Sequence, residues 1–396
     1  MELNKIDFNK FINQSKITFD ADYENACVKS VTRLGLDWYH IDLRPDTWYR
    51  FNFRMTGCKG REIIFDFTCL DTPDKRLSEG HFRWLYNEGY VHPVISYDGK
   101  NWEKVDNIEK VKENYGTYRF KHTFKEDTAY VSHQVPYTYS DMIDWIKTLE
   151  NNPNVDVEII GTTRNNIPQP ALTVTDNRKS RDMVIIIARE DADETGGSFG
   201  LEGFVDYLLN EKKYLLDKYV FKIVPMVGID GVVSGATHSA GYGYSGRNWN
   251  LEKSPAEIEN AKEFIRKAVN DGYQIVLAGK LHGASCPKID KGIDSFLISD
   301  KKVLDLLEAG LKEYYNRDWE PGNWDNEGDL SFMYPCPSIP QPRPLGYFER
   351  FIMDEFKTNN VFGTHILEYL PEVSIDGGKA VMNAVANFLD NFEENN

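Results

Sequence analysis

Acidic side chains that can hold a metal ion follow the longest buried strand that the sequence predicts. Residues 184–188 form a continuous apolar run, and Asp191 and Glu194 stand in the polar loop after it, ahead of apolar residues at helical spacing. Ligands of open α/β sheets bind outside the carboxyl ends of the strands. The loop is therefore a candidate metal site, although acids at this position also suit the positive end of a helix dipole.

Two more chemically active side chains lie at the ends of predicted strands later in the chain. His282 follows the predicted strand 275–281, and Glu368 lies in the last part of another around 363–369. Together with the acidic loop they suggest metal-assisted hydrolysis, in which ligands hold an ion that activates water and a carboxylate takes the proton. Cys286 is close to His282 but lacks the companion residues of a cysteine nucleophile, so we interpret it as a bystander.

An α/β domain is needed to position these residues. From residue 133 to 396 the predicted strands and helices alternate, which predicts an α/β domain with a mostly parallel or mixed sheet. Ser140 is the predicted cap of its first helix. Ser254 and Glu257 have the spacing of a capping box, with Pro255 at the first turn of a later helix.

Residues 1–132 follow a different pattern, which predicts an all-β sandwich domain. Short aromatic and β-branched runs at 38–43, 48–53 and 63–67 are separated by turn residues. Residues 94–105 predict a hairpin whose turn is formed by Asp98 and Gly99. No cluster of histidine, cysteine or acidic residues suited to chemistry stands out here, so we expect this domain to pack on, or gate, another part of the protein.

Composition limits the partners and the location of the chain. The 396 residues carry a formal net charge of −16, which argues against a nucleic-acid surface and against an anionic membrane partner. The apolar runs have the length of strands, so no transmembrane segment is predicted, and no signal peptide is found. Five widely spaced cysteines predict reduced thiols and a cytoplasmic location. The sequence leaves the oligomeric state open.

Short motifs that occur in a fixed order along the chain carry a family resemblance. They are residues 136–141, 194–195, 202–204, 224–226, 230–232, 254–257, 281–283 and 367–368. These motifs resemble, in the same order, those of the zinc metallocarboxypeptidases of the carboxypeptidase A clan. The branch that is most similar looks like the cytosolic carboxypeptidases, which carry a β-sandwich before the catalytic domain. The resemblance implies a mixed-sheet carboxypeptidase-like α/β domain that acts on C-terminal peptide or related amide bonds.

The resemblance also implies a metal site and a base. In the family, a His-x-x-Glu pair and a distant histidine bind zinc, and a late glutamate is the general base. Carried over to this chain, Asp191, Glu194 and His282 are the metal ligands and Glu368 is the base. The substrate is then expected to be a peptide or a small carboxylate.

Three further residues match substrate-binding positions of the family. Arg247 corresponds to the arginine that grips the terminal carboxylate of the substrate, a task that suits the planar fork of a guanidinium group. His238 falls where an oxyanion-stabilising arginine is expected. Tyr347 corresponds to the tyrosine that closes over the substrate.

Several positions depart from the pattern of the family. Asp191 replaces the first ligand histidine, which gives an atypical Asp-Glu-His site made of harder ligands, so manganese or iron would compete with zinc. Lys280 replaces an aspartate near the third ligand. Gly246 replaces an asparagine beside the carboxylate-binding arginine, and Asn166 replaces an arginine of the substrate loop.

The sequence leaves alternative functions open. The first hypothesis is a zinc carboxypeptidase-like peptidase, and the alternative is a catalytically impaired family member that binds peptides or carboxylates. A deacylase that acts on other substrates is a third function, because a fold does not fix its substrate. Only a substrate with a free carboxylate needs Arg247. A site without metal, in which Lys280 or another cation pairs with both acids, is the alternative to metal binding.

Overall fold

The chain forms two compact units, Met1–Pro136 and Tyr137–Asn396, which are described separately. The domain boundary predicted between residues 132 and 133 stays a prediction. His238, Gly246, Arg247, Cys286 and Glu368 lie outside the described residues. The computed structural model describes residues 16–44, 46–47, 50–68, 93–105, 108–110, 118–237, 248–284, 293–298, 301–316, 323–325, 328–329, 347–367 and 370–392.

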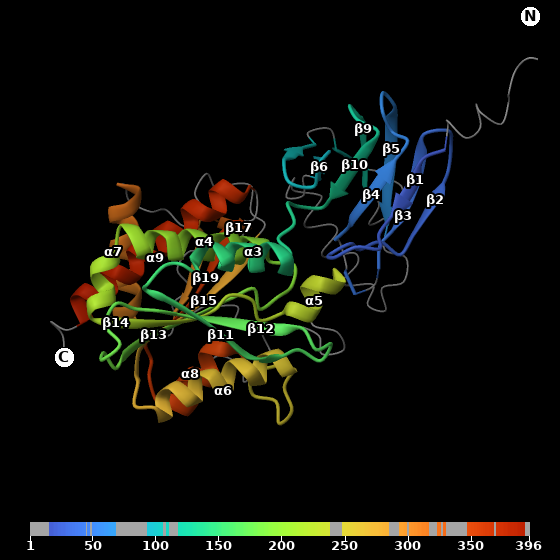
Figure 1. Cartoon of the computed structure of the whole chain (residues 1–396). Helices are drawn as coiled ribbons and strands as arrows, with labels where there is room; N and C mark the ends of the chain where they lie inside the picture. The colour runs from blue at the N-terminus through green and yellow to red at the C-terminus, as the bar shows by residue number, and fades with distance from the viewer. Residues whose placement is uncertain are drawn as a thin grey trace, which may run out of the picture. The chain divides into compact units, whose positions relative to one another are not determined.

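The first unit is a sandwich of two five-stranded sheets, which confirms the all-β prediction (Figure 1). One sheet has the order β1-β4-β10-β6-β7 and the other has the order β2-β3-β5-β9-β8. The strands are β1 (Thr18–Asp20), β2 (Ser30–Arg33), β3 (Trp38–Asp42), β4 (Asn52–Thr56), β5 (Glu62–Thr68), β6 (Val94–Ser96), β7 (Trp102–Lys104), β8 (Ile108–Lys110), β9 (Tyr118–Thr123) and β10 (Thr128–Ser132).

Aromatic rings fill the space between these two sheets. Phe53 of β4 and Phe65 of β5 come from different sheets, and their ring centroids are 5.8 Å apart. Phe67 stacks on Phe120 with a centroid separation of 5.5 Å, and all four rings are buried. Burial of such rings is a large apolar contribution to stability, so these residues form the core of the unit.

The predicted strands at 38–43 and 63–67 are confirmed by β3 and β5. Of the strand predicted at 48–53, residues 48–49 lie outside the described residues, and β4 starts only at Asn52. The backbone N–H of Arg50 donates instead to Thr47 O at 2.9 Å. The predicted hairpin is confirmed, since β6 and β7 pair antiparallel. Asp98 organises its turn by accepting hydrogen bonds from the backbone N–H groups of Lys100 and Asn101.

The second unit is built on one seven-stranded mixed sheet, as predicted. Its order is β11-β12-β14-β13-β15-β19-β16. The central pairs β14/β13, β13/β15 and β15/β19 are parallel, and the outer pairs are antiparallel. The strands are β11 (Val155–Thr162), β12 (Pro168–Val174), β13 (Asp182–Ala188), β14 (Tyr219–Val224), β15 (Gln274–Ala284), β16 (Ile293–Ile298) and β19 (Val361–Leu367).

Helices cover both faces of this sheet (Figure 1). The helices α3 (Tyr139–Leu149), α4 (Thr195–Asn210), α7 (Lys301–Tyr315) and α9 (Pro371–Phe392) lie on one face. On the other face lie α6 (Ala256–Asn270) and α8 (Phe348–Phe356). Short elements complete the unit: η2 (Lys213–Asp217), α5 (Ile229–Ser234), β17 (Asn323–Asp325) and β18 (Gly328–Asp329).

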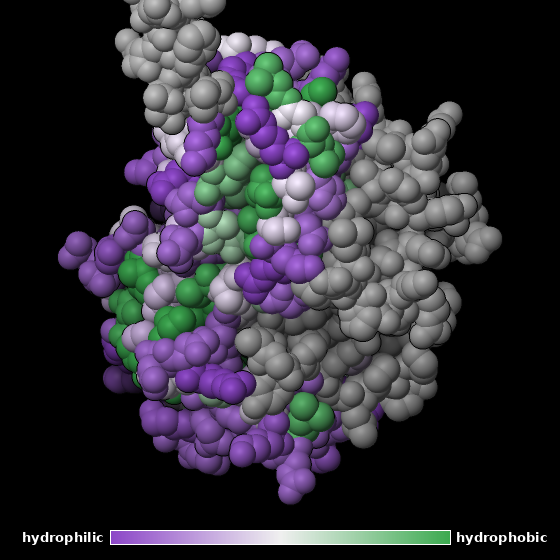
Figure 2. All heavy atoms as spheres, turned by 90° about the vertical axis from the view of Figure 1, so that its right-hand side faces the viewer, coloured by the Kyte–Doolittle hydropathy of each residue, from purple (hydrophilic) through white to green (hydrophobic). Residues whose placement is uncertain are grey.

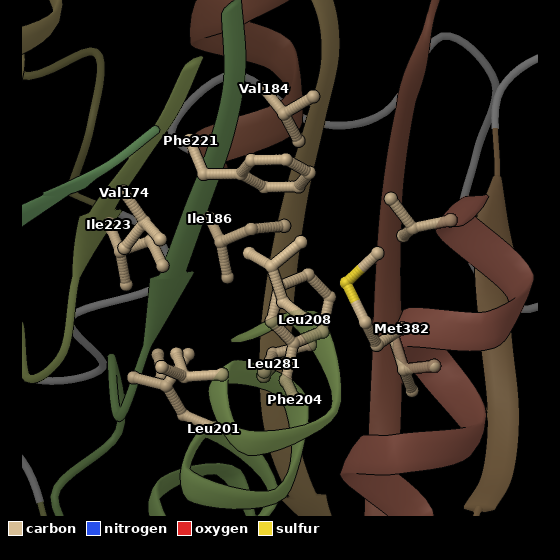
Figure 3. Packing of buried hydrophobic residues seen from close by; sticks show 14 of the residues in the cluster. Val174, Val184, Ile186, Leu201, Phe204, Leu208, Phe221, Ile223, Leu281 and Met382 are labelled. Carbon is tan, nitrogen blue, oxygen red and sulfur yellow. The ribbon is translucent and has the colours of Figure 1, made fainter. Parts of the chain in front are cut away.

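The central strand β13 is buried on both faces, which explains its continuous apolar sequence. Val184 and Ile186 pack into the cluster that includes α4 and α9, where Phe204 and Met382 meet them (Figure 3). The alternate side chains of the same strand, such as Ile185, pack into the cluster between the sheet and the helices α6 and α8. Because successive strand residues point to opposite faces, a strand between two helical layers needs apolar residues at every position.

Both predicted helix caps were wrong in detail. The first helix is capped by Thr138 rather than Ser140, since Thr138 Oγ1 accepts from Asp141 N at 3.0 Å and the chain enters the helix earlier. The helix α6 has Pro255 at its cap position and no side-chain cap bond. Ser254 instead donates to Asn248 O at 2.7 Å and accepts from Lys262 Nζ at 2.7 Å, so the expected capping box is not formed.

The surface of the described residues mixes hydrophilic and hydrophobic groups. On the face shown in Figure 2, hydrophobic residues form small groups between hydrophilic ones. Among the helices that the structure describes, none is both long enough and apolar enough to span a membrane.

Candidate metal centre

The three predicted metal ligands lie together at the carboxyl end of the central strands. One ligand atom from each of Asp191, Glu194 and His282 can be chosen so that all three lie within 4.8 Å of one another. The acidic loop leaves β13 after Ala188, and β15 runs parallel beside it with Ala188 opposite Leu281. This register places the histidine next to the loop, although β15 continues through His282 to Ala284 and does not end before it.

The imidazole of His282 presents its Nδ1 atom to the acids. Nδ1 lies 2.6 Å from Glu194 Oε2 and 4.0 Å from Asp191 Oδ2. The Gly283 backbone N–H donates to the same Glu194 oxygen at 3.2 Å. Glu194 occupies the cap position of α4 without a side-chain cap bond, so a helix-capping role does not account for this carboxylate.

A glycine allows the first turn of α4 to approach the neighbouring strand. A Cβ atom at Gly197 would lie 2.5 Å from the carbonyl oxygen of Leu281, which is too close for any other residue without a shift of the backbone. Because Glu194 immediately precedes α4 and His282 follows Leu281, this close packing brings the two candidate ligands together.

The side chain of Arg189 anchors the acidic loop through hydrogen bonds, and this residue was not predicted from the sequence. Its fully buried guanidinium donates twice to Ala192 O, at 3.1 and 2.9 Å, and once to Ser198 Oγ at 3.0 Å. A further bond reaches Tyr137 O at 3.2 Å. Arg189 also has a φ of 52°, a strained backbone conformation for a residue with a side chain. These bonds tie the loop to α4 and to the start of the unit.

The electrostatics of the cluster favour a bound cation. Burial raises the pKa of the Asp191 carboxyl well above its ordinary value, and repulsion by Glu194 adds to that effect. Burial likewise raises the pKa of Glu194, with a contribution from Asp193. Asp191 Oδ1 is buried and accepts no hydrogen bond from the described residues. A divalent ion would offset the repulsion and give this oxygen a partner, so the residues present fit such an ion.

Lys280 lies beside the candidate ligands within a separate set of charges. Its Nζ atom is 2.9 Å from Glu190 Oε2 and 3.4 Å from Glu349 Oε2. The indole N–H of Trp249 donates to the other oxygen of Glu190. The lysine therefore has two buried carboxylates of its own, and the close group of Asp191, Glu194 and His282 stays available for an ion.

Two other residues named in the sequence analysis, Tyr347 and Asn166, lie within the described residues, and one unpredicted histidine lies beside His282. Tyr347 precedes α8, and its ring centroid is 5.4 Å from Lys280 Nζ. Asn166 stands in an exposed turn between β11 and β12, with a φ of 61°. His365 was not predicted, yet its ring lies 5.2 Å from that of His282, opposite it on β19. Its place in the strand before Glu368 was the available signal.

Matches to family profiles agree with this architecture. Residues 142–285 match a profile described as zinc carboxypeptidase. Residues 19–133 match one described as cytosolic carboxypeptidase N-terminal domain.

Two relatives illustrate how far the similarity in sequence extends. Cytosolic carboxypeptidase 3 of Bos taurus is 27% identical over 306 residues, which are 68% of this chain and 29% of that protein. Cytosolic carboxypeptidase 6 of Mus musculus is 25% identical over 286 residues, which are 64% of this chain and 51% of that protein. The chain thus spans between about a third and a half of the length of these relatives.

Solved structures share the fold over nearly the whole chain. A metallo-carboxypeptidase from Burkholderia cenocepacia has a TM-score of 0.74 at 18% identity, covering 95% of this chain and 100% of that one. A metallo-carboxypeptidase from Pseudomonas aeruginosa, in complex with (2-guanidinoethylmercapto)succinic acid, has a TM-score of 0.73 at 17% identity, covering 94% and 99%. With both profiles matched in the expected order, the chain carries a cytosolic carboxypeptidase N-terminal domain at residues 19–133 and a zinc carboxypeptidase domain at residues 142–285.

Proposed function

We propose that this protein is a metal-dependent carboxypeptidase-like hydrolase that acts on C-terminal peptide or related amide bonds. The observation that carries the proposal is the convergence of Asp191, Glu194 and His282, whose ligand atoms lie within 4.8 Å of one another in a buried acidic setting. The match of residues 142–285 to the zinc carboxypeptidase profile makes zinc the expected ion. The two oxygen ligands also suit manganese or iron, which are harder ions.

The residues of the chain have separate tasks in this proposal. Asp191, Glu194 and His282 hold the ion, which when bound supplies a Lewis acid that polarises the scissile carbonyl and water. Glu368 takes a proton from the attacking water and returns it to the leaving amine. Arg247 binds the terminal carboxylate of the substrate through its planar fork. The roles of Glu368 and Arg247 rest on their match to the motifs of the family.

His238 and Tyr347 complete the proposed substrate site. The imidazole of His238 would donate a hydrogen bond to the oxyanion that forms during attack. This bond would stabilise the oxyanion less than the charged guanidinium of the arginine that His238 replaces. Tyr347 would close over the bound substrate. In support of this role, its ring already lies 5.4 Å from Lys280 Nζ, two residues before the metal ligand His282.

A family member that binds peptides or carboxylates without hydrolysis is the second candidate. The observation that favours it is the buried ammonium of Lys280, because its charge opposes a bound cation beside it. Asp191 adds to this case, since a second carboxylate ligand makes the ion less electrophilic than an imidazole would. In this reading Arg247 would still bind carboxylates.

A peptide assay with matched substrates separates the two candidates. Purified protein is loaded with zinc or manganese and incubated with a peptide that has a free C-terminus and with its C-terminally amidated form. The hydrolase releases C-terminal residues from the free peptide only, and chelation stops the release. Binding of the free peptide without release of product under any metal loading would contradict hydrolysis and favour the binding protein.

Replacing Arg247 by alanine tests the recognition of the terminal carboxylate. We expect weaker binding of the free peptide by ~1.5–3 kcal/mol, the scale of charge-assisted hydrogen bonds, and little change for the amidated peptide. Calorimetric titration of both peptides measures the difference. Equal losses for the two peptides would remove Arg247 from the carboxylate site and would reopen the case for a substrate without a free carboxylate.

A further inference from the structure

Four buried residues form a charge cluster beside the candidate metal centre, next to His282. The buried charge cluster consists of Glu190, Trp249, Lys280 and Glu349, each of which is at most 1% exposed. All four lie close in sequence to candidate site residues. Glu190 precedes Asp191, and Lys280 stands two residues before His282. Glu349 follows Tyr347 by two residues, and Trp249 follows Arg247 by two residues.

The contacts of the cluster fix the carboxylate of Glu190 at both oxygens. Oε1 accepts the indole N–H of Trp249, and Oε2 lies 2.9 Å from Lys280 Nζ. The second carboxylate, that of Glu349, is 3.4 Å from the same ammonium. Burial of a carboxylate without such partners would be strongly unfavourable, so the lysine and the indole compensate for the burial of Glu190.

The carboxylate of Glu190 also faces Nε2 of the candidate ligand His282. Glu190 Oε2 lies 3.9 Å from His282 Nε2, whereas Nδ1 of that ring faces Glu194 at 2.6 Å. An ion held by Glu194 would need the electron pair of Nδ1, and the ring proton would then sit on Nε2, the side that faces the carboxylate of Glu190. Histidine ligands of metals commonly donate their other ring N–H to a carboxylate, which fixes the ring and makes it a better ligand.

We propose that Glu190, held by Trp249 and Lys280, is the positioning residue of the metal centre, and that it orients His282 so that Nδ1 binds the ion. The inference rests on the proposed function, because it concerns the ion that Asp191, Glu194 and His282 would hold. Glu190 touches neither substrate nor ion. Lys280 has a supporting role, since it neutralises Glu190 and keeps that carboxylate from acting as a competing ligand.

Two variants with equal changes in charge separate positioning from simple electrostatics. Glu190→Gln and Glu349→Gln each remove one negative charge beside Lys280, but only the first alters the group that faces His282. We expect Glu190→Gln to weaken zinc binding about 10–100-fold, the usual effect of losing such a partner, and Glu349→Gln to weaken it much less. Calorimetric titration of chelator-stripped protein with zinc gives both dissociation constants.

Cobalt substitution supplies a readout that a purely structural role would not change. The visible absorption of bound Co²⁺ reports the ligand geometry, so Glu190→Gln should shift the spectrum while Glu349→Gln should leave it as in the wild type. Glu190→Asp, which keeps the charge but withdraws the carboxylate by one methylene, should also shift it. Glu190→Asp therefore keeps the test decisive if Glu190→Gln does not fold.

The outcomes distinguish failure of this inference from failure of the proposed function. Equal zinc affinities for wild type and Glu190→Gln, or equal losses for Glu190→Gln and Glu349→Gln, would overturn the positioning role while the wild-type protein still binds metal. An unchanged cobalt spectrum in both Glu190 variants would overturn it as well. A wild-type protein that binds neither zinc nor cobalt would overturn the proposed function first and this inference with it.

Discussion

At the scale of single residues, the centre differs from a two-histidine site by its excess of buried negative charge. Asp191 and Glu194 are held next to one another by the local chain, and burial raises the pKa of both carboxyls. Metal ligands must be deprotonated to bind, so protons on these two carboxyls compete with the ion as well as protons on His282. We therefore expect the pH dependence of metal binding to come from the acids as much as from the imidazole.

Metal affinity should fall steeply as the pH is lowered. A raised carboxyl pKa means that the metal-free protein holds protons at a pH where ordinary carboxyls have lost theirs, and each must leave on binding. We expect a plot of log Kd against pH to show release of more than a single proton per ion below neutral pH. Asp191→Asn should make the plot shallower. A wild-type plot whose slope corresponds to release of one proton per ion, with the midpoint of an ordinary histidine, would contradict the raised carboxyl pKa values.

Replacement of Glu368 by glutamine tests the proposed base. The variant should lose roughly 10²–10⁴-fold in kcat, the usual contribution of a general base, because an amide cannot take the proton of water. Binding of metal and of a non-hydrolysed peptide should stay as in the wild type, which the same titrations check. Hydrolysis at the wild-type rate would exclude Glu368 as the base.

At the scale of elements, the centre depends on how closely α4 approaches β15. Gly197 permits this approach, since any Cβ there would press on the carbonyl of Leu281, which lies next to His282. The start of α4 and the strand β15, which carry the candidate ligands Glu194 and His282, are thus joined by backbone packing. A change in this packing should alter the metal site even though Gly197 offers no ligand.

Gly197→Ala should therefore weaken both the fold and the metal site. Overpacking by one methyl group costs typically ~1–3 kcal/mol of unfolding free energy, and the shift of α4 should also lower zinc affinity. Gly310→Ala is the matched control, because its Cβ would meet Ala384 Cα at 2.6 Å between α7 and α9. Denaturant unfolding and zinc titration should find stability lowered in both variants and affinity lowered only in Gly197→Ala. Equal affinities would contradict the proposed coupling.

The sequence predicted the elements and the ligand cluster, but not what surrounds them. The strand β13 and the acidic loop could be predicted because an apolar run followed by acids is a local pattern. The caps at Ser140 and Ser254 were wrong, because several residues near each helix start can form a cap and tertiary contacts choose between them. Arg189 was also missed, since its partners are backbone carbonyls that leave no trace in sequence.

The buried charge cluster could not be predicted for a related reason. Glu190, Lys280 and Glu349 come from three separate parts of the chain, and no spacing rule connects them. Seen alone, Lys280 was only a departure from the pattern of the family. In the fold its ammonium lies between two buried carboxylates that come from other parts of the chain.

At the scale of the whole molecule, a cytosolic carboxypeptidase N-terminal domain precedes a zinc carboxypeptidase domain in one chain. The first has its own aromatic core, and the residues of the candidate metal centre all come from the second. The formal net charge of −16 does not prevent metal binding, but it requires that specific binding be distinguished from loose attraction of cations to surface acids.

The most direct test of the account is calorimetric titration of the chelator-stripped full chain with zinc, beside the His282→Ala variant. The account predicts saturable binding of one ion per wild-type chain and loss of that binding in His282→Ala. The variant keeps all of the acidic residues, so loose attraction of cations to surface acids would persist in it unchanged. Absence of saturable binding in the wild type, or equal binding in His282→Ala, would contradict a metal centre formed by Asp191, Glu194 and His282.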